Sequence, residues 1–156
     1  MKKSLGFSLL ELLVALGIAA ILVGVGGAAL RDATLDARRT ATLNGLLRAV
    51  HVARAEAVRT GREVVLCARG GPATGCAGPS ADWAEGWLVF VNEDRDRPAV
   101  ADADEPVLVT EGPRDGARIL GNRSAFRFLP FNRRSSNGTL VYCDQRGAVS
   151  ARAFIL

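Results

Sequence analysis

The chain has 156 residues, of which 49% are hydrophobic and 23% are charged, and its formal net charge is +4 at pH 7. This composition fits one ordinary globular domain and excludes a disordered chain, a collagen and a multi-span membrane protein. Three cysteines and one histidine provide few candidate ligands for a metal centre and few candidate residues for acid–base catalysis. We therefore expect no catalytic residue, no metal site and no cofactor.

The first predicted element is an apolar run over residues 7–30, FSLLELLVALGIAAILVGVGGAAL, in which Glu11 is the one charged residue. A run of about 20 apolar residues is long enough to cross a membrane as a helix. Lys2 and Lys3 precede it and Arg31 follows it. Basic residues beside a membrane helix tend to stay on the cytoplasmic side, so Lys2 and Lys3 favour a cytoplasmic N-terminus. A secretory signal peptide or a plain membrane anchor is the alternative. Neither explains Glu11, because a carboxylate in hydrocarbon costs at least about 2 kcal/mol.

The segment from Lys2 to Glu11 resembles the class III signal of type IV prepilins and type II secretion pseudopilins. That signal is a short basic leader, a glycine before the cut, a phenylalanine after it and a glutamate four residues further on. The resemblance implies that residues 1–6 are a leader peptide, that prepilin peptidase cuts between Gly6 and Phe7, and that the new Phe7 amine is N-methylated. It also implies that Glu11 pairs with the terminal amine of a neighbouring subunit, because two charges buried in an apolar filament core must neutralise each other.

Residues 31–60 are predicted to continue the helix with an amphipathic pattern. Apolar side chains recur at three- and four-residue spacing from Leu35 to Val58, and arginines occupy many of the other positions. The apolar stripe is expected to pack on a sheet, and Gly61 is expected to stop the helix.

Seven segments after Gly61 have the composition of short β-strands and are separated by turn residues. They are residues 63–67, 86–91, 107–110, 118–120, 125–129, 139–143 and 149–156. A long N-terminal helix packed on an antiparallel β-sheet is the pilin arrangement, an α+β fold. We expect residues 7–30 to be the membrane and assembly helix, and residues 31–156 to be a periplasmic globular domain whose β-part spans 62–156.

Trp83, the pair Gly86-Trp87, and Phe90-Val91-Asn92 followed by acidic residues resemble the GspH/FimT family of minor pseudopilins and minor pilins. The resemblance implies a structural subunit rather than an enzyme. It would be inserted in the bacterial inner membrane with its C-terminal domain in the periplasm. It would then be assembled into a type II secretion pseudopilus or a type IV pilus, in priming or at the tip. The implied partners are prepilin peptidase, other major and minor pilins and the inner-membrane assembly platform.

Two of the three cysteines are expected to form a disulfide. Cys67 and Cys76 are separated by eight residues rich in Gly and Pro, so a bond between them would close easily and would persist in the periplasm. Cys143 is then left as a free thiol in a predicted strand. A Cys67–Cys143 disulfide is the alternative if those two strands are neighbours.

The acidic stretch after the second strand has the start of a calcium loop, with Asn92, Asp94 and Asp96 at alternate positions. Arg97 stands where such a loop needs glycine, and Ala103 stands where it needs glutamate. The stretch is therefore predicted to be a solvated turn.

Every cation after the leader is an arginine, and six arginines with interleaved phenylalanines gather in one part of the sequence. They are Arg114, Arg118, Arg123, Arg127, Arg133 and Arg134. Such a cluster is a candidate nucleic-acid contact, and the alternative is an ordinary solvent-exposed surface with no binding role. Some FimT-like minor pilins capture DNA for natural transformation through a C-terminal Gly-Arg-x-Arg motif, which this sequence does not contain. DNA binding is the alternative function.

Overall fold

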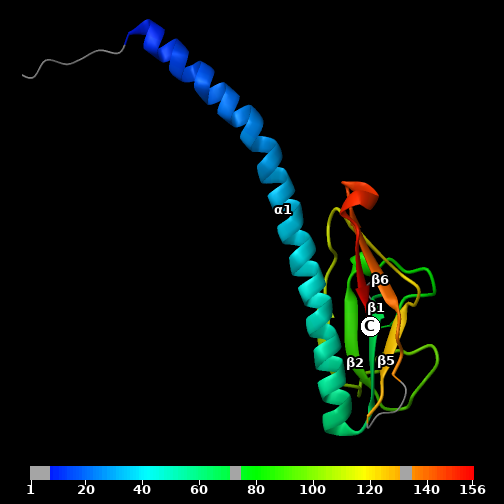
Figure 1. Ribbon diagram of the computed structural model, residues 1–156. Coiled ribbons are helices and arrows are strands. Elements are labelled where there is room, and N and C mark those ends of the chain that lie inside the picture. The colour runs from blue at the N-terminus through cyan, green and yellow to red at the C-terminus, as the bar shows by residue number, and fades with distance from the viewer. Residues whose placement is uncertain (1–7, 71–74, 131–134) are drawn as a thin grey trace, which may run out of the picture. The chain divides into compact units, whose positions relative to one another are not determined.

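The computed structural model of the chain describes residues 8–70, 75–130 and 135–156. It contains one long helix, α1 (Leu9–Thr60), followed by seven β-strands and two short 3-10 helices (Figure 1). The chain divides into two compact units, Met1–Arg38 and Arg39–Leu156, and α1 contributes to both. This arrangement confirms the predicted α+β class, with a long N-terminal helix and antiparallel sheets.

The first unit consists of the N-terminal part of α1. Its large apolar side chains from Leu9 to Leu30 are all exposed where they are described, with exposed fractions above one half. An 18-residue stretch of the helix has a mean hydropathy of 2.5, so α1 is long and apolar enough to cross a membrane. A surface this apolar is unfavourable in water and indicates that it contacts lipid or other apolar helices.

In the second unit, α1 buries an apolar stripe and ends where the sequence predicts. Leu46, Ala49 and Ala53 are fully buried in the main hydrophobic core. The helix ends at Thr60, and Gly61 adopts a left-handed φ of 71° while its N–H donates to the Ala57 carbonyl at 3.1 Å. A glycine in this conformation closes the last helical turn without a Cβ clash. The expected stop at Gly61 is confirmed.

The strands form two antiparallel sheets, and each predicted strand segment overlaps one of the observed strands. The strands are β1 (Glu63–Ala68), β2 (Trp87–Asn92), β3 (Val107–Glu111), β4 (Ala117–Gly121), β5 (Ala125–Phe128), β6 (Thr139–Asp144) and β7 (Arg152–Ile155). The first sheet has the order β3-β2-β1-β5, and the second has the order β4-β6-β7. Every pair of neighbours is antiparallel.

The last predicted strand is wrong at its start, because residues 147–150 form the short helix η2 (Gly147–Ser150). Gly147 has a φ of 75°, and the Arg146 N–H and guanidinium both donate to Asp144 just before it. Hydrogen bonding and charge from Arg146 hold the pKa of Asp144 below its usual value. The chain therefore turns sharply before β7. Val149, which the apolar pattern assigned to a strand, is 92% exposed.

Strand β1 is buried on both faces of the first sheet. Val64 and Leu66 belong to the core that includes the α1 stripe. Val65 and Cys67 point to the opposite face, where they join Phe90 of β2 in a second apolar cluster. Alternate residues of a strand point to opposite faces, so α1 covers one side of β1 and other segments must cover the second side.

The helix η1 (Trp83–Glu85) connects the two sheets. Oδ1 of Asp82, the residue before it, accepts from the Ala84 N–H at 2.9 Å and from the Ile119 N–H of β4 at 2.8 Å. Trp83 is fully buried, and its ring centroid lies 5.4 Å from that of Phe126 in β5. One short helix thus contacts a strand of each sheet.

Candidate functional sites

The predicted processing and assembly residues lie at the start of the chain. Gly6 and Phe7 fall outside the described residues. Glu11 lies in the first turn of α1, where the positive end of the helix dipole favours a carboxylate. Its side chain is exposed, as are Leu10 and Leu12 beside it. The carboxylate therefore lies on an apolar surface. Placing it in lipid would cost free energy unless a cation paired with it.

The disulfide joins the end of β1 to the segment that follows it. Cys67 and Cys76 are bonded, and the Ala77 N–H donates to the Ala68 carbonyl at 2.8 Å, which holds this segment beside the strand. Cys143 is a half-buried free thiol in β6, a strand of the other sheet. The structure therefore has the favoured Cys67–Cys76 pairing, and the alternative with Cys143 is wrong.

Removing the disulfide should lower the stability of the chain. Replacing both Cys67 and Cys76 by alanine frees a loop of this length in the unfolded state, for an expected loss of about 2–3 kcal/mol. Urea unfolding of the full chain in a non-ionic detergent, followed by tryptophan fluorescence, measures the change. Cys143→Ala is the matched control and should shift the midpoint much less. Equal midpoints for the double variant and the parent would contradict this role.

The acidic stretch after β2 is partly exposed. The prediction of a solvated turn holds for Asp94, which is exposed, and is wrong for Asn92, which is buried at the end of β2. Glu105, which follows this stretch, is also buried. Glu105 accepts from the N–H groups of Glu93 at 2.6 Å and Asp102 at 3.2 Å, and burial raises the pKa of Glu105. These carboxylate contacts hold the loop backbone. No group of three or more His, Cys, Asp or Glu residues in the described part of the chain is arranged to hold a metal ion.

Two of the candidate arginines form ion pairs with carboxylates of the same chain. The Arg114 guanidinium lies 5.0 Å from the Trp87 ring centroid and pairs with Glu111 at 2.6 Å. Arg118 of β4 faces Asp82 at 3.5 Å. Their charges are partly neutralised by these carboxylates, which reduces what they can contribute to binding a polyanion.

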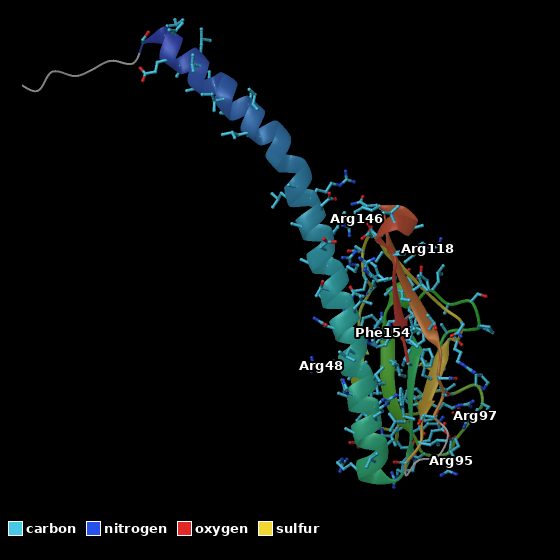
Figure 2. All side chains as sticks on the ribbon, viewed as in Figure 1. Arg48, Arg95, Arg97, Arg118, Arg146 and Phe154 are labelled. Carbon is cyan, nitrogen blue, oxygen red and sulfur yellow. A yellow bond between two sulfur atoms is a disulfide. The ribbon has the colours of Figure 1, made fainter. Side chains whose placement is uncertain are left out.

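Two other candidate arginines share a cavity with a third that sequence reasoning missed. Arg123 and Arg127 line it together with Arg97, which comes from the loop after β2. Figure 2 shows Arg97 and Arg118 toward opposite ends of the β-domain. Arg133 and Arg134 lie outside the described residues. Nothing in the sequence near Arg97 signals this juxtaposition, because the pairing of β1 with both β2 and β5 creates it.

Comparison with protein families decides between the pilin classes. A family model described as "Type II transport protein GspH" matches residues 42–155, which is more than half of the chain. The chain belongs to the GspH family. The first 27 residues match a second model, the prokaryotic N-terminal methylation motif. Neither a curated protein nor a solved structure gives a significant match.

Membership of the GspH family establishes the class of protein to which the chain belongs. The chain is a pseudopilin of type II secretion and a structural protein rather than an enzyme. Its methylation motif covers the predicted cleavage residues Gly6 and Phe7 as well as Glu11. The family implies processing by prepilin peptidase and assembly with other pseudopilins, and the exposed apolar half of α1 is consistent with an inner-membrane pilin.

Proposed function

We propose that this GspH pseudopilin is cut between Gly6 and Phe7, methylated on the Phe7 amine, and transferred from the inner membrane into a type II pseudopilus. Before assembly, the apolar half of α1 crosses the membrane with its N-terminus in the cytoplasm and the β-domain in the periplasm. After assembly, the same surface packs against the helices of other pseudopilins. The chain acts in priming or at the tip rather than as the shaft subunit, as its resemblance to minor pseudopilins implies.

The observation that carries this proposal is the position of Glu11. It is the one charged residue between Ser8 and Leu30, and it stands on a fully exposed apolar helix. Leaving a carboxylate in hydrocarbon is costly, and pairing it with a buried ammonium group offsets much of that cost. The free amine of Phe7, generated by cleavage in a neighbouring subunit, supplies such a group.

Substituting Glu11 by glutamine tests the pairing with little change in side-chain shape. We expect Glu11→Gln to be cleaved and methylated normally but to enter pseudopili at about one tenth of the wild-type level or less, because removing one partner leaves the other charge unpaired. Mass spectrometry of the mature N-terminus reads processing. Immunoblotting of sheared pseudopili reads incorporation, and immunogold labelling should place the wild-type chain at one filament end.

Asp32→Asn is the matched control, because Asp32 is an exposed acid of the same helix beyond the apolar run. It should incorporate normally. Wild-type incorporation of Glu11→Gln would refute the pairing. An intact Met1 or an unmethylated Phe7 in the native host would refute the processing step, and labelling along the whole filament would refute the tip or priming role.

A further inference from the structure

The cavity lined by the three arginines lies on the face of the first sheet opposite to α1. It has a volume of about 330 Å³ and lies between the β4–β5 connection, β5, the disulfide segment and the loop after β2. Its floor includes Val65, which points away from the α1 stripe. We call it the arginine pocket and define it by Arg97, Arg123 and Arg127.

The arginine pocket carries positive charge that the fold does not neutralise. Arg97 pairs with the buried Glu63 at 2.9 Å, so its charge is matched. Arg123 donates from Nε to the Asn137 carbonyl at 2.9 Å, which leaves its two terminal nitrogens available. Within the described residues, the Arg127 guanidinium has no hydrogen bond or ion pair, and no carboxylate lines the pocket. Two guanidinium groups on one cavity favour a bound anion such as a carboxylate.

Apart from Asn122 and Ser124, the rest of the lining consists of small or apolar residues. Val65 and Ala99 are buried members of the second apolar cluster, and Cys76 and Ala125 pack against that cluster. The cavity is at the lower end of the size range of ligand sites. It therefore suits one or two side chains rather than a large cofactor, and it combines an apolar floor with a cationic rim.

The walls of the arginine pocket are fixed rather than loose. The disulfide holds Cys76 beside β1, and the Glu63 carboxylate holds Arg97 against the end of the same strand. The carbonyl of Arg123 accepts from the Trp83 indole N–H at 3.0 Å, which anchors the β4–β5 connection to the core. A preformed site loses less conformational entropy when it binds a ligand.

We propose that the arginine pocket binds an acidic segment of a partner protein. A glutamate or aspartate carboxylate pairs with Arg123 and Arg127, and a neighbouring apolar side chain lies on Val65, Ala99 and Ala125. Charge complementarity selects this occupant. Nucleic acid fits less well, because a duplex needs a row of free cations, whereas the described Arg114 and Arg118 are paired with acids.

Fluorescence anisotropy of the full chain in a non-ionic detergent tests the proposal. The probe is a labelled soluble peptide in which glutamate alternates with valine, and detergent alone supplies the blank. We expect saturable binding that weakens with added salt, and a loss of at least about tenfold for Arg127→Gln and for Arg123→Gln. Thermal melting establishes that each variant is folded, and the second variant serves if the first is not.

Arg118→Gln is the matched control, because Arg118 is an exposed strand arginine outside the pocket. It should bind the peptide within about twofold of the affinity of the parent, because salt at physiological ionic strength screens the charge of a distant arginine. Equal affinity for the same peptide with glutamine in place of glutamate would overturn the proposal. So would unchanged binding by both pocket variants, or tighter binding of duplex DNA than of the peptide with the same loss in the variants. The assay requires neither processing nor filament assembly, so its failure is separate from failure of the proposed function.

Discussion

Replacing Trp83 by alanine is expected to lower the free energy of unfolding by about 3–5 kcal/mol, the range for truncating a fully buried tryptophan. Trp83 packs against Phe126 in one sheet, and its indole N–H donates to the Arg123 carbonyl beyond the end of β4. The variant therefore opens a cavity between the sheets and leaves a carbonyl without its partner. Domains of this size have about 5–15 kcal/mol in total, so the loss removes a large part of the stability.

Urea unfolding of the full chain in detergent, followed by circular dichroism, measures this loss. Trp83→Phe is the graded control, since it keeps most of the ring packing but loses the hydrogen bond, and it should cost about 1–2 kcal/mol beyond any repacking. A Trp83→Ala variant within about 1 kcal/mol of the parent would mean that Trp83 does not hold the sheets together, because even partial collapse of such a site leaves a larger cost.

Replacing Gly86 by alanine is expected to destabilise the chain by about 3–5 kcal/mol, from backbone strain and a steric clash acting together. Gly86 has a φ of 114°, a conformation that residues with a Cβ rarely adopt. A Cβ there would lie well inside 3.0 Å of the Glu111 carbonyl oxygen, a backbone atom of the neighbouring strand β3. The clash cannot be relieved by rotating a side chain.

Gly112→Ala is the matched control, because a Cβ at Gly112 meets nothing within 4 Å and its φ lies outside the strained range. Its midpoint should stay within about 0.5 kcal/mol of the parent, as for an ordinary surface substitution. Thermal and urea unfolding of both variants provide the comparison. If Gly86→Ala is as stable as Gly112→Ala, β3 can move away from the loop at little cost, and the strain argument is wrong.

Local patterns in the sequence predicted the secondary structure well. The end of α1 at Gly61 depends on one residue that adopts a left-handed conformation. Each strand from β1 to β6 coincides with a run of apolar or alternating residues. The exception at Val149 has a physical reason. Its apolar side chain fits a strand pattern, but the turn at Gly147 and the contacts between Arg146 and Asp144 bend the chain first.

Burial of charged residues could not be predicted in the same way. Asn92 was predicted to lie in a solvated turn because acidic residues follow it in the sequence. It is buried because it is the last residue of β2, and its side-chain amide donates to Asp96 Oδ1 at 3.1 Å. Glu105 is buried where the loop folds back and the N–H groups of Glu93 and Asp102 donate to its carboxylate. Such contacts depend on where a loop crosses its sheet, which no local pattern specifies.

The sequence by itself determined the class of this protein. Lys2 and Lys3, Gly6 before Phe7, Glu11 and a long apolar run lie close together in the chain, and the first 27 residues match the prokaryotic N-terminal methylation motif. The tertiary structure decided which arginines act together. Arg97, Arg123 and Arg127 line one cavity because β1 pairs with β2 on one side and β5 on the other, and long-range strand pairing of this kind is set by the packing of the whole domain rather than by adjacent residues.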